Sequence, residues 1–284
     1  MKKHIDLHSH TIYSDGGDTP ESLVRAMHMS GVEIMALTDH DTLAGYARAK
    51  IEADLYGFRI IPGVEISTNR YHILGLNVDP NESTLQSLLK RSRIYQEGEC
   101  QQRIDILAKL GMPITFEKLK NLYPESRIGK WNVIMSILAD SECREFLSKN
   151  NNLVLTPRES FEYYIGKSGI AAKIKHPETI HSLDAIEAIH NAGGIAIIAH
   201  PFKQVKDIGR EMGKLVQKGI DGVEIQPNYG VQNEPFREYA IRNELMMTYG
   251  SDFHGAGYNR ALLGKRENGV EANVFEEMMN KWRK

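Results

Sequence analysis

The stretch that decides the fold reads His4-Ile5-Asp6-Leu7-His8-Ser9-His10 and lies near the start of the sequence. Its first part, His4–Leu7, indicates a short strand, and two histidines follow at the point where that strand ends. Side chains two residues apart on an extended segment project to the same side, so both imidazoles can reach one ion. The stretch therefore predicts a strand that delivers two nitrogen ligands at its carboxyl end.

The rest of the chain repeats the pattern of a short apolar run followed by a longer amphipathic stretch. The strands that it predicts are His4–Leu7, Ile34–Thr38, Arg59–Ile61, Tyr71–Leu76, Ile195–Ala199, Gly222–Ile225 and Met246–Tyr249. Helical periodicity covers Pro20–Ser30, Thr42–Tyr56, Leu183–Asn191, Val205–Lys218 and Asn233–Asn243. This alternation is typical of an α/β fold with a mostly parallel sheet, and seven strands favour a barrel or a nearly closed sheet.

The alternation is interrupted between about residues 85 and 181. Helical patterns dominate there, as over Leu85–Leu110 and Val133–Leu147, and no segment clearly indicates a strand of the main sheet. We therefore predict a barrel formed by residues 1–84 and 182–284, with residues 85–181 inserted as a helical subdomain that covers the active site.

Composition and charge exclude several classes of protein. The 284 residues, 41% hydrophobic and 25% charged, suffice for one α/β barrel, and a net charge of −2 provides no field to hold duplex nucleic acid. Cys100 and Cys143 lie far apart in helical stretches, which favours neither a disulfide nor a thiolate zinc site. No stretch approaches the roughly 18 apolar residues of a membrane span. We expect a cytoplasmic protein with no membrane partner.

Titratable side chains recur at the ends of the predicted strands. His40 follows the second strand, Glu65 the third and His200 a later one. Asp252 and His254 follow the last strand and are again two residues apart. The carboxyl ends of all strands share one face in a parallel barrel, so these residues should converge at the face where barrel enzymes carry their active sites.

Topology places two further candidates less directly. His72 begins a predicted strand instead of following one. Asp15 lies in the loop Ser14-Asp15-Gly16-Gly17-Asp18, whose glycines allow the backbone to turn back toward the end of the first strand. The remaining histidines have no such placement and are not expected to be ligands; they are His4, His28, His176, His181 and His190.

The candidate ligands favour a cluster of metal ions over a set of unrelated surface residues. A single His-x-His or Asp-x-His pair is more often part of a surface loop, but so many charged groups crowded at apolar strand ends would repel one another unless cations neutralised them. Nitrogen and oxygen ligands without thiolates suit Mn²⁺, Zn²⁺ or Fe²⁺, and nine candidates imply two or three ions. Such ions lower the pKa of a bound water from about 15.7 toward about 7, which predicts hydrolysis of a phosphate monoester by an activated hydroxide.

At these motifs the sequence resembles the PHP superfamily, which includes polymerase-associated domains and histidinol-phosphate phosphatases. The matching motifs are Asp6-Leu7-His8-Ser9-His10, Ser14-Asp15-Gly16, Leu37-Thr38-Asp39-His40-Asp41, Pro62-Gly63-Val64-Glu65, His72-Ile73-Leu74-Gly75, Ala199-His200-Pro201 and Gly250-Ser251-Asp252-Phe253-His254. The resemblance implies a distorted seven-stranded βα barrel and a site for three divalent ions, of which Mn²⁺ is our first expectation.

Carried over motif by motif, the resemblance distributes the ligands among three ions. The first would be held by His8, His10, Glu65 and Asp252, the second by Glu65, His72 and His200, and the third by Asp15, His40 and His254. The members that we expect to be catalytic are Glu65, Asp252 and His254. As hydrogen-bond acceptors that orient imidazoles, we predict Asp6, Asp39 and Asp41.

The length and the helical insertion are similar to those of family members that act on nucleoside 3′,5′-bisphosphates and on the 5′ ends of short RNA. Their usual Gly-Arg-Pro-His element is replaced here by Gly129-Lys130-Trp131-Asn132, which keeps a cation but loses the forked guanidinium of arginine. Tyr163-Tyr164-Ile165-Gly166-Lys167 looks like the aromatic-glycine element of the family. The predicted contacts for a second phosphate are Lys130, Lys167 and Arg260; the alternative for both lysines is an ordinary solvated surface charge.

The sequence therefore predicts a metal-dependent phosphoesterase that acts on a small nucleotide or a short oligonucleotide end. An alternative keeps the metal cluster but takes a phosphorylated metabolite such as histidinol phosphate, and Trp131 or Tyr163 facing a base would favour the nucleotide. A non-catalytic binding module is a third possibility, whose mark would be missing ligands, whereas every expected ligand is present. The sequence leaves the oligomeric state open.

Overall fold

The computed structural model describes residues 4–149, 156–174, 179–255 and 280. The strands are β1 His4–Asp6, β2 Val32–Leu37, β3 Arg59–Ser67, β4 His72–Leu76, β5 Ile195–Ile198, β6 Gly222–Glu224 and β7 Met246–Thr248. The helices are α1 Pro20–Met29, α2 Tyr46–Leu55, α3 Ser83–Lys109, α4 Phe116–Leu122, α5 Lys130–Ala139, α6 Ser141–Lys149, α7 Pro157–Tyr164, α8 Ser182–Asn191, α9 Ile208–Gln217 and α10 Glu234–Arg242. Short 3₁₀ helices are η1 Pro201–Lys203 and η2 Pro227–Asn233.

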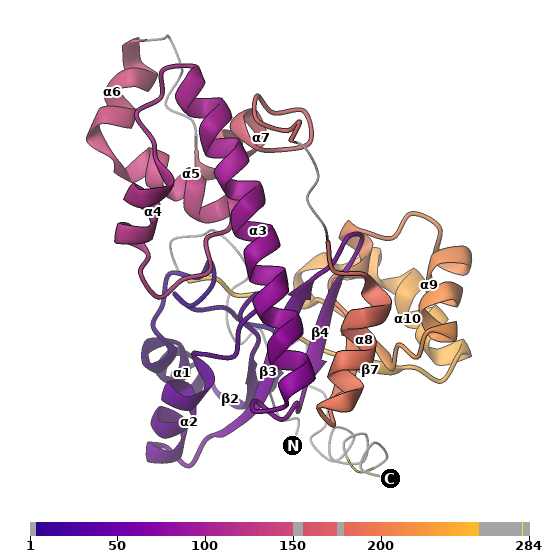
Figure 1. The fold of residues 1–284 in the computed structure, drawn as a ribbon. Helices are drawn as coiled ribbons and strands as arrows, with labels where there is room; N and C mark the ends of the chain where they lie inside the picture. Colours follow the sequence, from indigo (N-terminus) through magenta and orange to yellow (C-terminus); the bar gives the residue numbers. More distant parts are fainter. Residues whose placement is uncertain (1–3, 150–155, 175–178, 256–279, 281–284) are drawn as a thin grey trace. The chain divides into compact units, whose positions relative to one another are not determined.

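The seven strands form one curled sheet in the order β1 to β7, which confirms the predicted α/β barrel architecture (Figure 1). Hydrogen bonds beyond the strand ends join the two edges of this sheet. Leu7 N donates to Tyr249 O at 2.9 Å, and Asp252 N donates to His8 O at 2.9 Å. The segment after β7 therefore lies beside the segment after β1, and this backbone pairing joins the two edges of the sheet at the ends that carry the candidate ligands.

Strand β4 runs antiparallel to its neighbours β3 and β5, whereas the other neighbouring strands are parallel. The amino end of an antiparallel strand lies at the same face as the carboxyl ends of the parallel strands. His72 is the first residue of β4. The reversal of this one strand therefore brings His72 to the face of the other candidates although it begins a strand.

Strand β3 is longer than the predicted Arg59–Ile61 and holds Glu65 within it instead of after it. Its first half pairs in parallel with β2, ending at Leu37 and Pro62, and its second half pairs with β4 from Gly63 to Ser67. Proline and glycine weaken a strand pattern, so they concealed the second half from the sequence. A Cβ at Gly63 would lie 2.8 Å from Thr38 Cγ2, so this glycine permits the close approach of the neighbouring strand.

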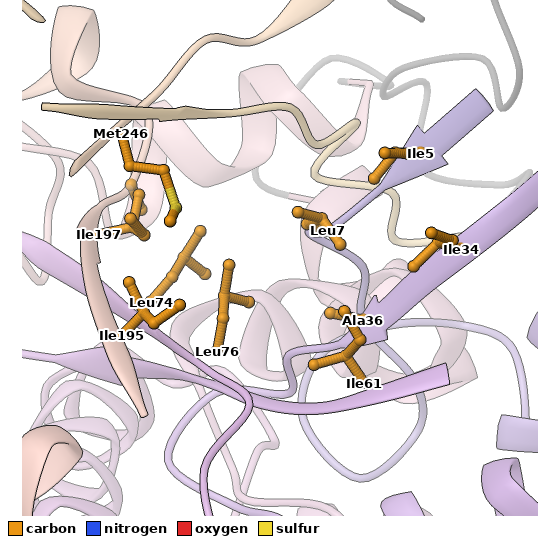
Figure 2. Packing of buried hydrophobic residues seen from close by; sticks show 11 residues of the cluster. Ile5, Leu7, Ile34, Ala36, Ile61, Leu74, Leu76, Ile195, Ile197 and Met246 are labelled. Atoms are coloured by element: carbon orange, nitrogen blue, oxygen red, sulfur yellow. The ribbon is translucent and has the colours of Figure 1, made fainter. Parts of the chain in front are cut away.

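Branched aliphatic side chains fill the interior of the curled sheet. Figure 2 shows Leu7, which follows β1, close to Leu74 and Leu76 of β4 and Ile197 of β5 in a common cluster. The complete cluster is Ile5, Leu7, Ile34, Ala36, Ile61, Leu74, Leu76, Ile195, Ile197, Ala199 and Met246. Burial of each large member contributes about 1.5–3 kcal/mol relative to an exposed side chain. The interior of the sheet around these residues is therefore apolar.

Helices cover the outer face of the sheet. A second apolar cluster joins α1 and α2 to β2 and β3 and includes Leu23, Met27, Met35, Ala53 and Ile60. Helix α1 begins after Thr19, whose hydroxyl accepts a hydrogen bond from Ser22 N at 3.2 Å. Helix α8 packs against β4 and β5, and α10 packs against β6 and β7.

The chain divides into two compact units. The sheet unit comprises Met1–Ser92 and Ile180–Lys284, and the helical unit comprises Arg93–Thr179. The predicted insertion starts at residue 85, whereas the division falls inside α3, whose first turns belong to the sheet unit and bury Leu85 and Leu89. No helix among the described residues is long and apolar enough to cross a membrane.

In the helical unit, the predicted helix Val133–Leu147 is two helices, α5 and α6. The chain leaves the helical conformation at Asp140, with φ −76° and ψ 129°, and Asp140 Oδ1 accepts a hydrogen bond from Cys143 N at 2.8 Å to begin α6. Trp131 is buried, and its ring meets that of Phe161 edge-on with centroids 5.0 Å apart. Trp131 is therefore part of the core of this unit, and Tyr163 is the exposed one of the two candidate aromatics.

Candidate metal centre

Glu65 lies at the centre of the polar face of the sheet unit and is completely buried. Its Oε2 lies 3.1 Å from His8 Nε2, 3.2 Å from His10 Nε2 and 3.2 Å from His40 Nδ1. Its Oε1 lies 2.9 Å from His72 Nδ1 and 2.9 Å from His200 Nε2. The two carboxylate oxygens thus face two different sets of imidazoles, as a carboxylate placed between cations must.

Four ligand atoms, from His8, His10, Glu65 and Asp252, lie within 4.8 Å of one another. Asp252 Oδ1 is 3.5 Å from both His8 Nε2 and His10 Nε2. A parallel backbone bridge between Ser9 and Phe253 places the pair His8 and His10 beside the pair Asp252 and His254. All four residues are buried, and a cation among them would satisfy two imidazole nitrogens and two carboxylate oxygens at once.

A second group contains His10, Asp15, His40 and His254. Asp15 Oδ1 is 3.3 Å from His254 Nε2 and 3.8 Å from His40 Nε2. This oxygen is buried and accepts no hydrogen bond, which is costly unless a cation or a protonated imidazole compensates. A Cβ at Gly16 would lie 2.6 Å from His10 C, so glycine is needed for the loop to turn Asp15 back toward β1.

His72 and His200 occupy the remaining side of the centre. Both bind Glu65 Oε1, and their ring centroids are 5.3 Å apart. His40, Glu65 and His72 also form a group whose ligand atoms lie within 4.8 Å. His72 is 36% exposed at its side chain, whereas His200 is buried, so solvent reaches the centre beside His72. The structure thus brings all nine predicted ligands to one face of the sheet unit.

Two of the predicted ligands lie on strained backbone. His200 has φ 29° and Asp252 has φ 56°, in the left-handed region that residues with a Cβ seldom adopt. Such conformations cost about 1–3 kcal/mol each and persist only where the surroundings hold them. The orientation of these two side chains therefore comes at a cost in the stability of the fold.

The acidic residues predicted to orient imidazoles have other hydrogen-bond partners. Asp6 Oδ1 accepts hydrogen bonds from His8 N and Ser251 N, and Asp39 accepts from Thr11 and Ser14. Asp41 Oδ1 accepts from Ser67 N and Ser92 Oγ. For Asp6 and Asp39 the prediction is therefore wrong. Short carboxylates next to a turn reach its backbone amides first, so they fix the loops that carry the ligands.

Three residues that the sequence did not single out contact the predicted ligands. Glu224, at the end of β6, accepts a hydrogen bond from His8 Nδ1 at 2.7 Å. Gln204 Nε2 lies 2.9 Å from His200 Nδ1, and Lys203 Nζ lies 2.9 Å from Asp252 Oδ2. Glu224 ends β6, so it is a titratable side chain at a strand end like the predicted ligands. The predicted strand Gly222–Ile225 extended one residue further, so this signal did not select it.

Burial opposes the charged forms of these groups, and their mutual attraction overcomes it at most positions. Burial would lower the pKa of His8, but Glu224, Glu65 and Asp252 raise it well above the ordinary value. Burial is likewise outweighed at His10, whose pKa hydrogen bonds to Asp252 and Glu65 raise to about 9. The pKa of Glu65 lies well below the usual range because attraction to His40, His8 and His72 outweighs burial. Protons on these imidazoles therefore compete with any cation for the same nitrogens.

This competition predicts opposite pH trends for the metal-free and the metal-bound protein. The pKa of His10 rises from 6.5 to about 9 on folding, so its contribution to stability is complete below about pH 6.5 and is lost as the pH rises through about 9. Metal must displace that proton, so the increase in Tm caused by Mn²⁺ should grow over the same interval. Thermal melts with and without Mn²⁺ measure both trends. An increase that shrinks with rising pH would contradict the assignment. The control is His28→Gln, because His28 lies in α1 with its ring near that of Tyr56.

The predicted phosphate contacts lie elsewhere. Lys130 begins α5 in the helical unit, where its Nζ is 3.6 Å from Glu99 Oε2 and its side chain is 41% exposed. Lys167 is exposed in the turn after α7. Arg260 lies outside the described residues. The role of these three basic side chains as phosphate contacts stays a prediction.

The chain is similar to known proteins over most of its length. The family described as the PHP domain matches residues 6–228. A 5′-3′ exoribonuclease of Haemophilus influenzae is 34% identical over 264 residues, which cover 89% of this chain and 91% of that protein. A 3′,5′-nucleoside bisphosphate phosphatase of Chromobacterium violaceum is 29% identical over 274 residues, which cover 93% of this chain and 91% of that protein.

The fold also matches a solved structure over nearly its whole length. A protein of Bifidobacterium adolescentis, described as a metal-dependent phosphoesterase, has a TM-score of 0.81 and 25% identity to this chain. The match covers 98% of this chain and 96% of the other. Sequence and fold thus point to the same chemistry as the cluster around Glu65.

Proposed function

The chain belongs to the PHP family and is a metal-dependent phosphoesterase, and from this premise we propose that it hydrolyses a phosphate monoester on a small nucleotide or on a short oligonucleotide end. The observation that carries the proposal is the buried Glu65 carboxylate, whose two oxygens face different sets of imidazoles. No apolar core needs such a group, and a phosphate dianion needs several positive charges in one place.

The metal centre that we propose holds three divalent ions, with Mn²⁺ first among the candidates. Converging atoms support two of the three predicted ligand sets. One is His8, His10, Glu65 and Asp252, and the other is Asp15, His40 and His254, whose ligand atoms also lie close to one of His10. The remaining set is Glu65 with His72 and His200, which share Oε1. Imidazole and carboxylate donors without thiolate suit Mn²⁺, Zn²⁺ and Fe²⁺ alike.

When bound, the ions supply a nucleophile at neutral pH and take up charge on the phosphoryl oxygens. The chain's own residues aim the ligands and keep their protons in the right places. His254 Nδ1 donates to Asp252 O at 2.8 Å, so its Nε2 faces Asp15 without a proton. Lys203 holds Asp252 Oδ2, which leaves Oδ1 for the cluster. Glu65, Asp252 and His254 are the residues to which we assign catalysis.

The substrate part of the proposal is supported by the relatives, of which one is named for a bisphosphate and one for RNA. We assign Lys130 and Lys167 to the phosphate that is not cleaved. Lys130 would share its charge between that phosphate and Glu99, and exposed Tyr163 is available to stack on a base.

A nucleoside 3′,5′-bisphosphate is expected to exceed the matching 5′-monophosphate in kcat/KM by roughly 10- to 100-fold, the effect of a charge-assisted hydrogen bond of about 1.5–3 kcal/mol. Binding energy from the second phosphate can be used at the reacting centre, so kcat should fall with its loss as well as affinity. Steady-state kinetics with Mn²⁺ on both nucleotides, and on histidinol phosphate, measure this preference.

Lys130→Ala should narrow the difference in kcat/KM between the bisphosphate and the monophosphate. Lys109→Ala removes an exposed lysine of the same unit and should leave that difference unchanged. Equal kcat/KM for the two nucleotides would refute the contact with a second phosphate. A clear preference for histidinol phosphate would replace the nucleotide by a phosphorylated metabolite.

A further inference from the structure

Glu224 is a completely buried carboxylate that ends β6 directly behind the ligands. Its Oε1 accepts a hydrogen bond from His8 Nδ1 at 2.7 Å. Its Oε2 accepts a hydrogen bond from His200 N at 2.6 Å and a longer one from Gln226 Nε2 at 3.3 Å. One side chain therefore ties the histidine after β1 to the histidine after β5.

The bond to His8 decides which ring nitrogen carries the proton. Because Glu224 accepts at Nδ1, the neutral ring has its proton there and presents the lone pair of Nε2. That Nε2 is 3.1 Å from Glu65 Oε2 and 3.1 Å from His10 Nε2, inside the cluster. The opposite tautomer would direct an N–H into the ligand set and exclude a cation.

The bond to His200 holds strained backbone. His200 has φ 29°, and its amide would otherwise be buried without an acceptor at the point where the chain leaves β5. The space for this arrangement is made at Gly250, where a Cβ would lie 2.7 Å from Glu224 Oε1 and closer still to His8 Cβ. The local packing is thus arranged around the carboxylate.

We infer that Glu224 is a positioning residue of the metal centre: it fixes the tautomer of His8 through one oxygen and the strained backbone of His200 through the other. The inference rests on the metal centre proposed above. It adds a residue that touches no ion and no substrate, and it acts only through the two histidines.

Glu224→Gln is the diagnostic change, since it keeps the shape of the side chain but leaves one acceptor oxygen where two are used. The backbone N–H of His200 cannot change from donor to acceptor, so it should retain the oxygen. The amide NH₂ then faces His8 Nδ1, which must accept, and the proton moves to Nε2. Glu224→Asp keeps both acceptors but withdraws them by one methylene, and should fall between the wild type and Glu224→Gln.

The experiment measures metal content, Mn²⁺ affinity and the tautomer of His8. Elemental analysis and Mn²⁺ titration should show affinity about 10- to 100-fold weaker in Glu224→Gln, the usual cost of losing a residue that orients a metal-binding histidine. Nitrogen NMR of the Zn²⁺-loaded wild type should show the His8 proton on Nδ1. Glu52→Gln, which alters a buried carboxylate paired with Arg25 at 2.7 Å, is the matched control and should bind metal as the wild type does.

The outcomes separate the role of Glu224 from the metal centre itself. If the wild type and Glu224→Gln bind the same amount of metal and the His8 tautomer is the same in both, the role of Glu224 is refuted and the metal centre is not. Wild-type protein that binds no metal would refute the centre and the inference with it. If Glu224→Gln does not fold, the wild-type spectrum still decides, because a Zn²⁺-loaded His8 with its proton on Nε2 contradicts the inference.

Discussion

Replacing Glu65 with Gln is expected to lower kcat by at least about 10²–10³-fold, the effect of removing one preorganised electrostatic group from an active site. Five imidazole nitrogens lie within 3.2 Å of the Glu65 oxygens, and the pKa of this buried carboxylate is held well below its usual range. The amide has no charge and directs an NH₂ group at some of these nitrogens. Bound metal should therefore be lost together with turnover.

Two variants show whether that loss is specific to Glu65. Lys130→Ala should chiefly raise KM and should lower kcat far less than Glu65→Gln does, because Lys130 is assigned to substrate binding and not to the ions. Glu52→Gln removes a buried carboxylate between α1 and α2 and should leave kcat and metal content unchanged. A Glu65→Gln protein with near wild-type kcat and metal content would contradict the assignment of Glu65 as the carboxylate shared by two ions.

The architecture was predictable because each strand has a local pattern. His4, Arg59, Ile195, Gly222 and Met246 begin strands in both the prediction and the structure. The direction of β4 was not predictable in the same way, since parallel and antiparallel pairing depend on the partner and not on the alternation of residues within the strand. His72 was therefore the candidate ligand with the weakest support from topology, and the resemblance strengthened it. The reversal of β4 supplies the physical reason for its position.

The predicted ligands of the centre were easier to identify from sequence than the residues that hydrogen-bond to them. His8, His10 and His254 stand out because apolar strand ends have no need of imidazoles. Glu224 lies inside the predicted strand Gly222–Ile225 and not at its end, and the role of orienting an imidazole was predicted for Asp6 instead. Which carboxylate meets His8 Nδ1 depends on the pairing of β5 with β6, a contact between segments far apart in the sequence.

The helical unit shows the limit of periodicity. Val133–Leu147 has a continuous apolar pattern, yet Asp140 caps a new helix because its carboxylate reaches the amide of Cys143. Trp131 looked available to a base from sequence alone, and the structure packs it against Phe161. Burial depends on what the rest of the unit places opposite a side chain, which a local pattern does not contain.

Removal of divalent metal is expected to abolish activity and to lower the Tm. The converging nitrogen and oxygen atoms around Glu65 and Asp15 have no other physical use, and loss of cations leaves buried carboxylates to be neutralised by imidazolium alone. A ligand that binds only the folded state at about 100 times its Kd stabilises it by about 2.7 kcal/mol. Chelation followed by dialysis, assayed for phosphatase activity and by thermal melting, measures both effects, and Mn²⁺ should restore them.

The restoration separates a catalytic centre from a structural one, since a structural ion would restore the Tm without restoring turnover. His190→Gln is the matched control: His190 lies in α8, where its Nε2 is 2.8 Å from Asp221 Oδ2, and it contributes no atom to the groups around Glu65 and Asp15. That variant should respond to chelation and to Mn²⁺ as the wild type does, because its histidine is not a ligand. If protein purified without chelator carries no transition metal, and Mn²⁺, Zn²⁺ and Fe²⁺ each produce no phosphatase activity, the metal centre is wrong.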